Sequence, residues 1–207
     1  MAYKQLTGRV LARSQAFQIL FQSEATGRPV ANVLGDEYAL EDGPLSKYGR
    51  KLAEGAGSCI ETLDAIIDCV SDNWNVNRIS SVDRNLLRIA VYEMVYVDEV
   101  DTAIAINEAV ELAKIYGTDE SPRFINGLLG RAARIMDEQD LVAYALEAKR
   151  VKDEKLRIAR EAREAEEARR AEEERKAEEA REAEAARQAE EVAAYNASAS
   201  SKERFHG

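Results

Sequence analysis

The stretch from Ala103 to Arg134 constrains the fold of this chain most, because it predicts two consecutive helices joined by a short turn. Asn107, Glu111 and Lys114 share one side of the first helix, and Gly117 should end it. The opposite side is apolar, at the spacing of a half-buried helical face. Its members are Ile106, Ala109, Val110, Ala113 and Tyr116.

The second helix of this stretch should begin at Pro122. Proline suits the first helical position because its missing N–H would have no partner there, and Ser121 is placed to cap the free amides. Arg123, Asn126 and Arg131 remain for water or a partner. The apolar stripe consists of Ile125, Leu128, Leu129 and Ala132. The two helices together indicate a helical bundle.

Charge and composition divide the chain of 207 residues. Residues 1–146 contain nearly all the large apolar side chains and carry 22 acids and 14 bases. Residues 147–191 carry 16 acids and 13 bases. We therefore expect an all-α, compact orthogonal bundle over residues 1–141, a long charged single helix over 142–193 and a disordered end over 194–207. An acidic domain repels phosphate at long range, so binding of nucleic acid needs a local basic patch or a partner.

Two charges fall inside apolar helix faces. Arg13 lies on the inner arc of a helix expected over residues 9–25, and Glu93 lies within a central helix expected over 82–97 and capped by Ser81. A lone charge removed from water costs several kcal/mol, so each needs a partner. We therefore expect Arg13 to form an internal ion pair with Glu93 or, failing that, with Glu108. The alternative is that Arg13 lies at the edge of its helix and contacts a ligand.

The connecting segments are less regular. Residues 28–46 are rich in turn formers and predict a mostly irregular connection, whereas residues 47–73 predict one long helix or a broken pair. Gly55 and Gly57 lie in its first half, where we expect them to permit close approach of another helix. Trp74 should be a packing aromatic and the nearby Arg78 an exposed charge, and the alternative is that both belong to a ligand-binding edge.

The charged helix has too few apolar residues for a core. Ion pairs at i,i+4, such as Glu166 with Arg170 and Glu172 with Lys176, can keep it helical. A coiled coil would need Leu, Ile or Val at its a and d positions, which here hold Ala or charge. The tail thus resembles a coiled coil in composition only, and a solvated single helix is favoured over a dimerising one.

Catalytic and metal-binding patterns are absent from the sequence. His206 is the only histidine, which excludes His-based triads and His-ligated metals, and Cys59 and Cys69 cannot build a structural zinc site. Ten residues apart on one helix, they cannot form a disulfide either. We expect no enzyme activity, no cofactor and no metal. Without a secretory or membrane-spanning segment, the expected localisation is cytoplasmic.

Three blocks of the sequence resemble one family. INEAVELAKIYGTDESPRFINGLLG, from Ile106 to Gly130, looks like the signature segment of the NusB family. ARSQAFQILFQSE, from Ala12 to Glu24, is similar to that family's first helix, and VDRNLLRIAVYEMVYVDEV, from Val82 to Val100, to its central helix. The resemblance covers roughly Val10 to Arg134 and leaves the final third outside.

The resemblance implies a transcription antitermination factor that binds boxA-type single-stranded RNA with the ribosomal protein NusE, supports ribosomal RNA transcription and joins the RNA polymerase antitermination complex. Asp101 stands where many members have proline, and the N-terminal segment has fewer arginines than in several relatives. Carried over by position, the RNA edge includes Lys4, Arg9, Arg13, Gln18, Phe21, Arg123, Phe124 and Asn126. The partner surface includes Asp83 and Glu120, and the polar side of the central helix adds Arg84 and Arg88 where a partner could reach them.

Two other functions stay open at this point. A helical scaffold could use the tail for another partner without binding RNA, and a NusB-like domain also occurs ahead of ribosomal RNA cytosine methyltransferase domains. No cofactor loop follows here, which disfavours the second. The family resemblance leaves open whether the chain is a monomer or a homodimer.

Overall fold

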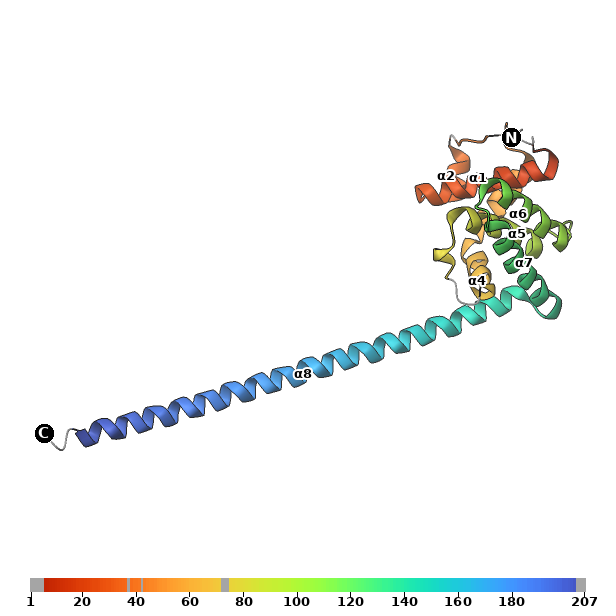
Figure 1. Ribbon diagram of the computed structural model, residues 1–207. Helices are drawn as coiled ribbons and strands as arrows, with labels where there is room; N and C mark the ends of the chain where they lie inside the picture. The colour runs from red at the N-terminus through yellow and green to blue at the C-terminus, as the bar shows by residue number, and fades with distance from the viewer. Residues whose placement is uncertain (1–5, 37, 42, 72–74, 204–207) are drawn as a thin grey trace. The chain divides into compact units, whose positions relative to one another are not determined.

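The computed structural model describes residues 6–36, 38–41, 43–71 and 75–203, and the described residues form helices and connections without strands. This confirms the all-α prediction. The helices are α1 Gly8–Thr26, α2 Val30–Gly35, α3 Lys47–Ser58, α4 Ile60–Val70, α5 Ser81–Tyr96, α6 Thr102–Tyr116, α7 Ser121–Glu138 and α8 Leu141–Glu203, with a 3₁₀ turn η1 at Val76–Arg78 (Figure 1).

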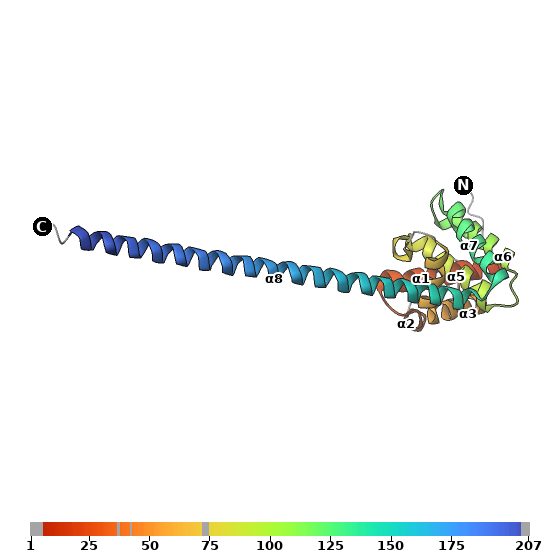
Figure 2. The same cartoon turned by 90° about the horizontal axis from the view of Figure 1, so that it is seen from below.

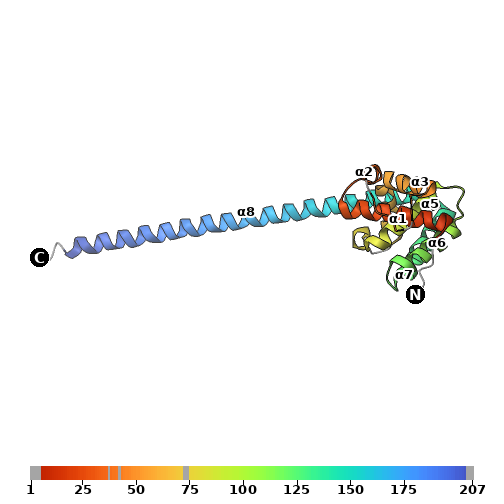
Figure 3. The ribbon, with the colours of Figure 1, turned by 90° about the horizontal axis from the view of Figure 1, so that it is seen from above.

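Helix α5 is the axis of the bundle. It packs against α1, α3, α4, α6 and α7, and α1 in turn covers α3 (Figures 2 and 3). Its apolar side chains lie almost wholly out of water because neighbours surround it. The buried set includes Leu86, Leu87, Ile89, Ala90 and Val91.

The helix starts differ from the prediction by one residue. Ser80, not Ser81, caps α5: its hydroxyl oxygen accepts a hydrogen bond from the Asp83 amide at 3.1 Å. Ser81 instead begins the helix, since serine at either position satisfies the local pattern. Asp101 caps α6 by accepting from the Ala103 amide at 2.8 Å. Gly117 ends α6 as expected.

Between α1 and α5 the described residues form α2, α3, α4 and the 3₁₀ turn η1. The connection at 28–46 is less irregular than predicted, because Val30–Gly35 forms the short helix α2 and buries Val30 and Val33. Where one long helix or a broken pair was predicted over 47–73, the described residues up to 71 form the broken pair α3 and α4, separated at Cys59. Trp74 lies outside the described residues.

Gly55 and Gly57 permit close approach, as expected. A Cβ at Gly55 would lie 2.1 Å from the Tyr92 hydroxyl oxygen on α5, and one at Gly57 would lie 2.7 Å from the Val30 Cβ on α2. Glycine at these two positions therefore lets α3 pack directly against its neighbours.

The chain divides into two compact units, residues 1–151 and 152–207. The first unit extends beyond the predicted boundary at 141, because Leu141 and Ala145 at the start of α8 are buried in the core. The disordered end predicted from residue 194 differs from the structure, in which α8 continues to Glu203. Within the described residues, no helix combines the length and apolar character that crossing a membrane requires.

Candidate RNA and partner interface

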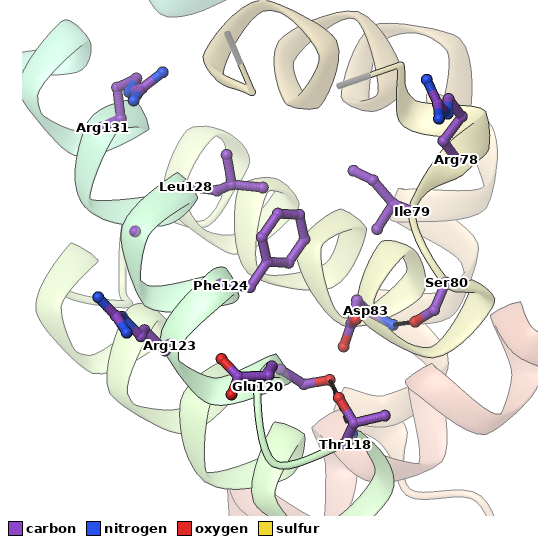
Figure 4. Close-up of a pocket in the computed structure, with 12 residues that line it drawn as sticks. Arg78, Ile79, Ser80, Asp83, Thr118, Glu120, Arg123, Phe124, Leu128 and Arg131 are labelled. Carbon is purple, nitrogen blue, oxygen red and sulfur yellow. Dashed lines mark hydrogen bonds between the residues drawn. The ribbon is translucent and has the colours of Figure 1, made fainter. Parts of the chain in front are cut away.

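A groove of about 560 Å³ lies between α7 and the segment that leads into α5. Segments far apart in sequence form it: η1 with the start of α5, the turn after α6, and α7 (Figure 4). Its lining residues are Arg78, Ile79, Ser80, Asp83, Thr118, Glu120, Ser121, Arg123, Phe124, Gly127, Leu128 and Arg131. We refer to it as the α5–α7 groove.

The floor of this groove is apolar and its rim is charged. Phe124 points from α7 across the groove toward Ile79, with Leu128 beside it (Figure 4). Arg123 and Glu120 lie at the rim and are exposed. An aromatic ring between charges of both signs can stack on a planar group or pack against a partner side chain, while the rim sets orientation.

The turn before α7 is held by a side chain. Ser121 does not cap α7 as predicted. It is the first residue of that helix, and its hydroxyl oxygen accepts a hydrogen bond from the Thr118 amide at 3.0 Å. Pro122 follows it in the first turn, as expected. The buried Ser121 therefore closes the turn that carries Glu120 into the groove.

Asp83 contributes an acceptor to the groove that the described residues leave unused. Its Oδ1 is buried and has no hydrogen-bond partner among them. A buried acceptor without a donor is costly, so an N–H or O–H from a bound partner would be favoured at this atom.

Arg84 and Arg88 turn inward. The Arg84 Nη2 lies 2.6 Å from Glu24 Oε1, and its Nη1 donates to the carbonyl oxygens of Val76 at 2.8 Å and Ile79 at 3.2 Å. Arg84 thereby ties η1, which forms one wall of the groove, to α1. The Arg88 Nη1 lies 2.7 Å from Glu24 Oε2.

The second anchor of Arg88 is Asp64 on α4, whose Oδ1 lies 2.7 Å from Arg88 Nε. Only 7% of Arg88 is exposed, so the expectation of an accessible polar side is wrong for this residue. The sequence pattern failed because Glu24 and Asp64 lie on other helices and gave no local sign of their pairing.

Glu24 is held in its ionised form by these arginines. Burial alone would raise the pKa of its carboxyl group, but hydrogen bonds from Arg84 and Ser81 and the charges of Arg84 and Arg88 outweigh burial and lower the pKa to about 2. Glu24 therefore joins α1 to α5 as an anion over the physiological pH range.

A second groove, of about 390 Å³, lies beside α1. Phe21 is 37% exposed on its edge, and Phe17 packs between Phe21 and Tyr116 with ring centroids 5.9 Å and 4.8 Å away. We refer to it as the α1 groove. Its lining residues are Phe17, Gln18, Phe21, Gln22, Ala39, Leu40, Glu41, Val82 and Tyr116.

The side-chain amide of Gln18 is used within the protein, where it helps to shape the α1 groove. Only 9% of Gln18 is exposed. Its Nε2 donates to the Tyr116 hydroxyl oxygen at 3.2 Å, and its Oε1 accepts from the Glu41 amide at 3.0 Å. Gln18 thus joins α1 to α6 and to the connection before α3.

Arg13 is buried, which confirms the predicted ion pair. Its Nε lies 2.7 Å from Glu93 Oε2, and its Nη1 lies 3.5 Å from Glu108 Oε2. Tyr48 donates a hydrogen bond to Glu93 Oε1 at 2.6 Å. Burial and this carboxylate raise the pKa of the Tyr48 phenol. The alternative of a helix-edge RNA contact is wrong in this conformation, since 3% of Arg13 is exposed. Tyr48 was not foreseen as a partner.

The predicted site residues therefore separate into groups. Asp83, Glu120, Arg123 and Phe124 meet in the α5–α7 groove, and Gln18 and Phe21 meet in the α1 groove. Arg9 lies elsewhere, with its guanidinium 5.1 Å from the Tyr48 ring centroid, and Asn126 is exposed on α7. Lys4 lies outside the described residues. Arg78 is exposed as expected and lines the α5–α7 groove, whereas nothing in the sequence marks Ile79 as a groove residue.

The two grooves lie next to each other, because residues that are close in sequence line one groove or the other. Val82 and Tyr116 line the α1 groove, whereas Asp83 and Thr118 line the α5–α7 groove. The start of α5 and the end of α6 therefore separate two apolar depressions on one side of the bundle.

The described residues contain no cluster of three or more metal-ligating side chains. Cys59 and Cys69 are free thiols, and burial raises the pKa of each. A raised pKa keeps a thiol protonated and unreactive at neutral pH.

An all-α domain with two apolar grooves and internally paired charges belongs to the class of helical binding proteins. Residues 11–134 match the NusB family, and the chain belongs to that family. Its relatives are transcription antitermination proteins, not enzymes.

Individual relatives are similar to this chain over most of their own length. The transcription antitermination protein NusB of Salinispora tropica is 44% identical over 131 residues, covering 62% of this chain and 96% of that protein. The NusB of Rubrobacter xylanophilus is 46% identical over 121 residues, covering 58% and 86%.

Solved structures agree with the fold. NusB of T. maritima superposes with a TM-score of 0.53 at 34% identity, covering 60% of this chain and 89% of that one. A structure of the antitermination factors NusB and NusE in complex with double-stranded RNA has a TM-score of 0.51 at 26% identity and covers 59% and 92%.

Proposed function

We propose that this chain is a transcription antitermination factor that binds boxA-type single-stranded RNA together with a NusE-type ribosomal protein. In this role it would support ribosomal RNA transcription as part of an RNA polymerase complex. Family membership supports the proposal, and the related NusB described in complex with NusE and double-stranded RNA supports RNA and NusE as ligands in general. The observation that carries it is the α5–α7 groove, which brings Asp83, Glu120, Arg123 and Phe124 together.

The two ligands would use different chemistry in this groove. Phe124 offers a ring on which a base can stack, worth about 1–3 kcal/mol per base and insensitive to salt. Arg123 at the rim offers a phosphate contact. Asp83 offers its unused acceptor to a donor of the partner protein.

The charge of the domain explains why a partner is needed. Residues 1–146 carry 22 acids against 14 bases, and several of those bases are consumed internally. Arg13, Arg84 and Arg88 pair with glutamates or an aspartate. A NusE-type protein with basic residues beside the groove would supply the missing phosphate contacts, so tight RNA binding should require the complex.

Titration of labelled boxA RNA with this chain, with and without the NusE-type partner, tests the proposal. We expect weak binding alone and at least tenfold tighter binding with the partner. Phe124→Ala should weaken RNA binding by about 5- to 150-fold, since a stacked base is worth about 1–3 kcal/mol. Ile104→Ala, an exposed apolar residue outside both grooves, is the matched control.

Asp83→Ala, which removes the unused acceptor, distinguishes binding of the partner from binding of RNA. It should weaken association with the partner while leaving the weak binding of RNA alone unchanged. Equal RNA affinity with and without the partner would show that the proposal is wrong. Light scattering of this chain, with and without the partner, reports whether a homodimer competes for the same surface.

A further inference from the structure

The second unit of the chain contains a short basic segment followed by a long acidic one. Residues 152–163 hold five bases and three acids, whereas residues 164–191 hold six bases and twelve acids. All side chains from 152 to 190 are exposed. The excess of positive charge is therefore confined to the first three turns of this unit.

Those bases share one face of α8. At about 100° per residue, Lys152, Lys155, Arg160 and Arg163 fall within an arc of about 140°. Leu156 and Ala159 lie in the same arc and add no charge. The three acids of the segment, Asp153, Glu154 and Glu161, fall outside it. We refer to Lys152, Lys155, Arg160 and Arg163 as the basic face.

The acids outside the arc are partly neutralised by another residue. Arg157 Nη2 lies 2.7 Å from Glu154 Oε1, and Arg157 Nη1 lies 2.7 Å from Glu161 Oε1. The side of the helix opposite the basic face therefore carries a net charge of −2, against +4 on the basic face, so the positive potential of this segment lies on the basic face.

Ion pairs at the end of the basic face are weak. Arg160 Nε lies 2.8 Å from Glu164 Oε1, and Arg163 Nε lies 3.0 Å from Glu167 Oε1. The arginine side chains are 79% and 81% exposed. Exposed pairs gain little over water, so a phosphate, which binds arginine in a fork, can replace these glutamates.

We propose that the basic face of α8 binds the phosphate backbone of RNA, independently of sequence. This inference rests on the proposed function, because it adds sequence-independent phosphate contacts from the tail to those that the NusE-type partner would supply. Lys152 to Arg163 span about 16 Å along the helix, enough to follow several phosphates. The acidic segment that follows repels RNA and confines contact to these turns.

The charges favour RNA over a second copy of the chain. A coiled-coil seam needs large apolar residues at a and d, and the basic face contains one, Leu156. Four cations in one arc without an intervening acid fit a uniform polyanion better than they fit the mixed charges of residues 164–191.

The experiment compares two full-length variants. The first replaces Lys152, Lys155, Arg160 and Arg163 by glutamine. The matched control replaces Arg169, Arg175, Arg181 and Arg187 by glutamine, which removes the same charge from the acidic segment. Binding of a single-stranded oligouridylate without a boxA element is measured by anisotropy from 50 to 200 mM salt, with circular dichroism to confirm equal helix content.

Loss of four phosphate contacts should lower the slope of log affinity against log salt by about 3. The wild type should therefore lose about 50-fold more affinity across this salt range than the first variant, and the control should behave like the wild type. The first variant should still prefer boxA RNA over a scrambled sequence when the NusE-type partner is present.

Equal slopes for the wild type and the first variant would overturn the inference but leave the proposed function standing. If the wild type with the NusE-type partner bound boxA RNA no more tightly than a scrambled sequence, the proposed function would be contradicted instead. Light scattering compares the mass of the wild type with that of the first variant. A dimeric wild type and a monomeric first variant with equal salt slopes would assign the basic face to a second copy of the chain, and this would also overturn the inference.

Discussion

Arg13 and Glu93 form an ion pair that lies almost entirely out of water, with exposed fractions of 3% and 1%. Each charge was removed from water during folding, so each depends on the other and on the Tyr48 hydroxyl. Glu24 plays the same part for Arg84 and Arg88 nearer the surface. At the residue scale, internal charge pairs hold α1 against α5 and keep arginines away from ligands.

Arg13→Ala should destabilise the domain by about 3–5 kcal/mol, because it leaves Glu93 buried without its cation. Urea unfolding measures the change. Replacing Arg13 and Glu93 together by methionine and leucine should cost less than Arg13→Ala alone, since no buried charge then remains. Arg123→Ala, at an exposed position, is the control and should leave stability unchanged. Unaltered stability of Arg13→Ala with weaker RNA binding would make Arg13 a surface ligand instead.

Glu24 should make stability depend on acid pH. Its pKa is about 2 in the folded protein and near the ordinary 4.5 in the unfolded chain. A lowered pKa gives stability that is fully present above about pH 4.5 and is lost as the pH falls toward 2. Glu24→Gln should thus cost about 1.5–3 kcal/mol at pH 7, and the difference from wild type should shrink below pH 4.5.

Unfolding curves at several pH values between 7 and 2.5 measure this trend, with the exposed Glu99→Gln as the control. Stability curves of Glu24→Gln and wild type that stay parallel down to pH 2.5 would contradict the role given to Glu24.

At the scale of the elements, close packing decides which residues a helix can contain. Gly55 costs helix propensity within α3, yet the ring of Tyr92 occupies the space where a side chain would be. Arg84 is placed on α5 for a tertiary reason as well, because its guanidinium donates hydrogen bonds to the carbonyl oxygens of Val76 and Ile79 and so holds η1 against the helix. The α5–α7 groove exists because such contacts fix η1 and the turn after α6.

Gly55→Ala should destabilise the protein by about 1–3 kcal/mol through overpacking against Tyr92. The matched control is Gly127→Ala on α7, where an added Cβ meets nothing within 4 Å and should stabilise the helix by up to about 1 kcal/mol. Thermal unfolding measures both changes. Adding Tyr92→Ala to Gly55→Ala should make the alanine at 55 less harmful. A stabilising Gly55→Ala would show that α3 and α5 are farther apart than the structure describes.

The whole molecule consists of a domain stabilised by a core and a helix stabilised by its own backbone and ion pairs. The domain's core ends with Leu141 and Ala145, whereas residues 152–190 bury no side chain. The two units should therefore unfold for different reasons and under different conditions.

Deletion of residues 152–207 should leave the melting temperature of the domain within about 2 °C of the full chain, because no buried apolar area is lost. Deletion from residue 141 should lower it clearly, since Leu141 and Ala145 are removed from the core. Differential scanning calorimetry of both truncations measures the effect. A large loss on deleting 152–207 would mean that the tail packs on the domain.

The sequence by itself determined most of the helices and the buried axis, because apolar periodicity and glycine or proline signals are local properties of the chain. It indicated the family through the resemblance of three sequence blocks. It predicted the Arg13–Glu93 pair, since both charges stood within apolar arcs, but Glu108 and a surface position of Arg13 stayed open until the structure was known. It predicted four residues of the α5–α7 groove only through the family resemblance.

The tertiary structure alone decided which charges are available. Arg88 looked accessible on its own helix, but Glu24 on α1 and Asp64 on α4 bury it in a network that no local pattern records. The same holds for Ile79, which lines the groove only because Arg84 ties its carbonyl oxygen to α5. Pairing between distant segments depends on how helices pack, and packing depends on every neighbour at once.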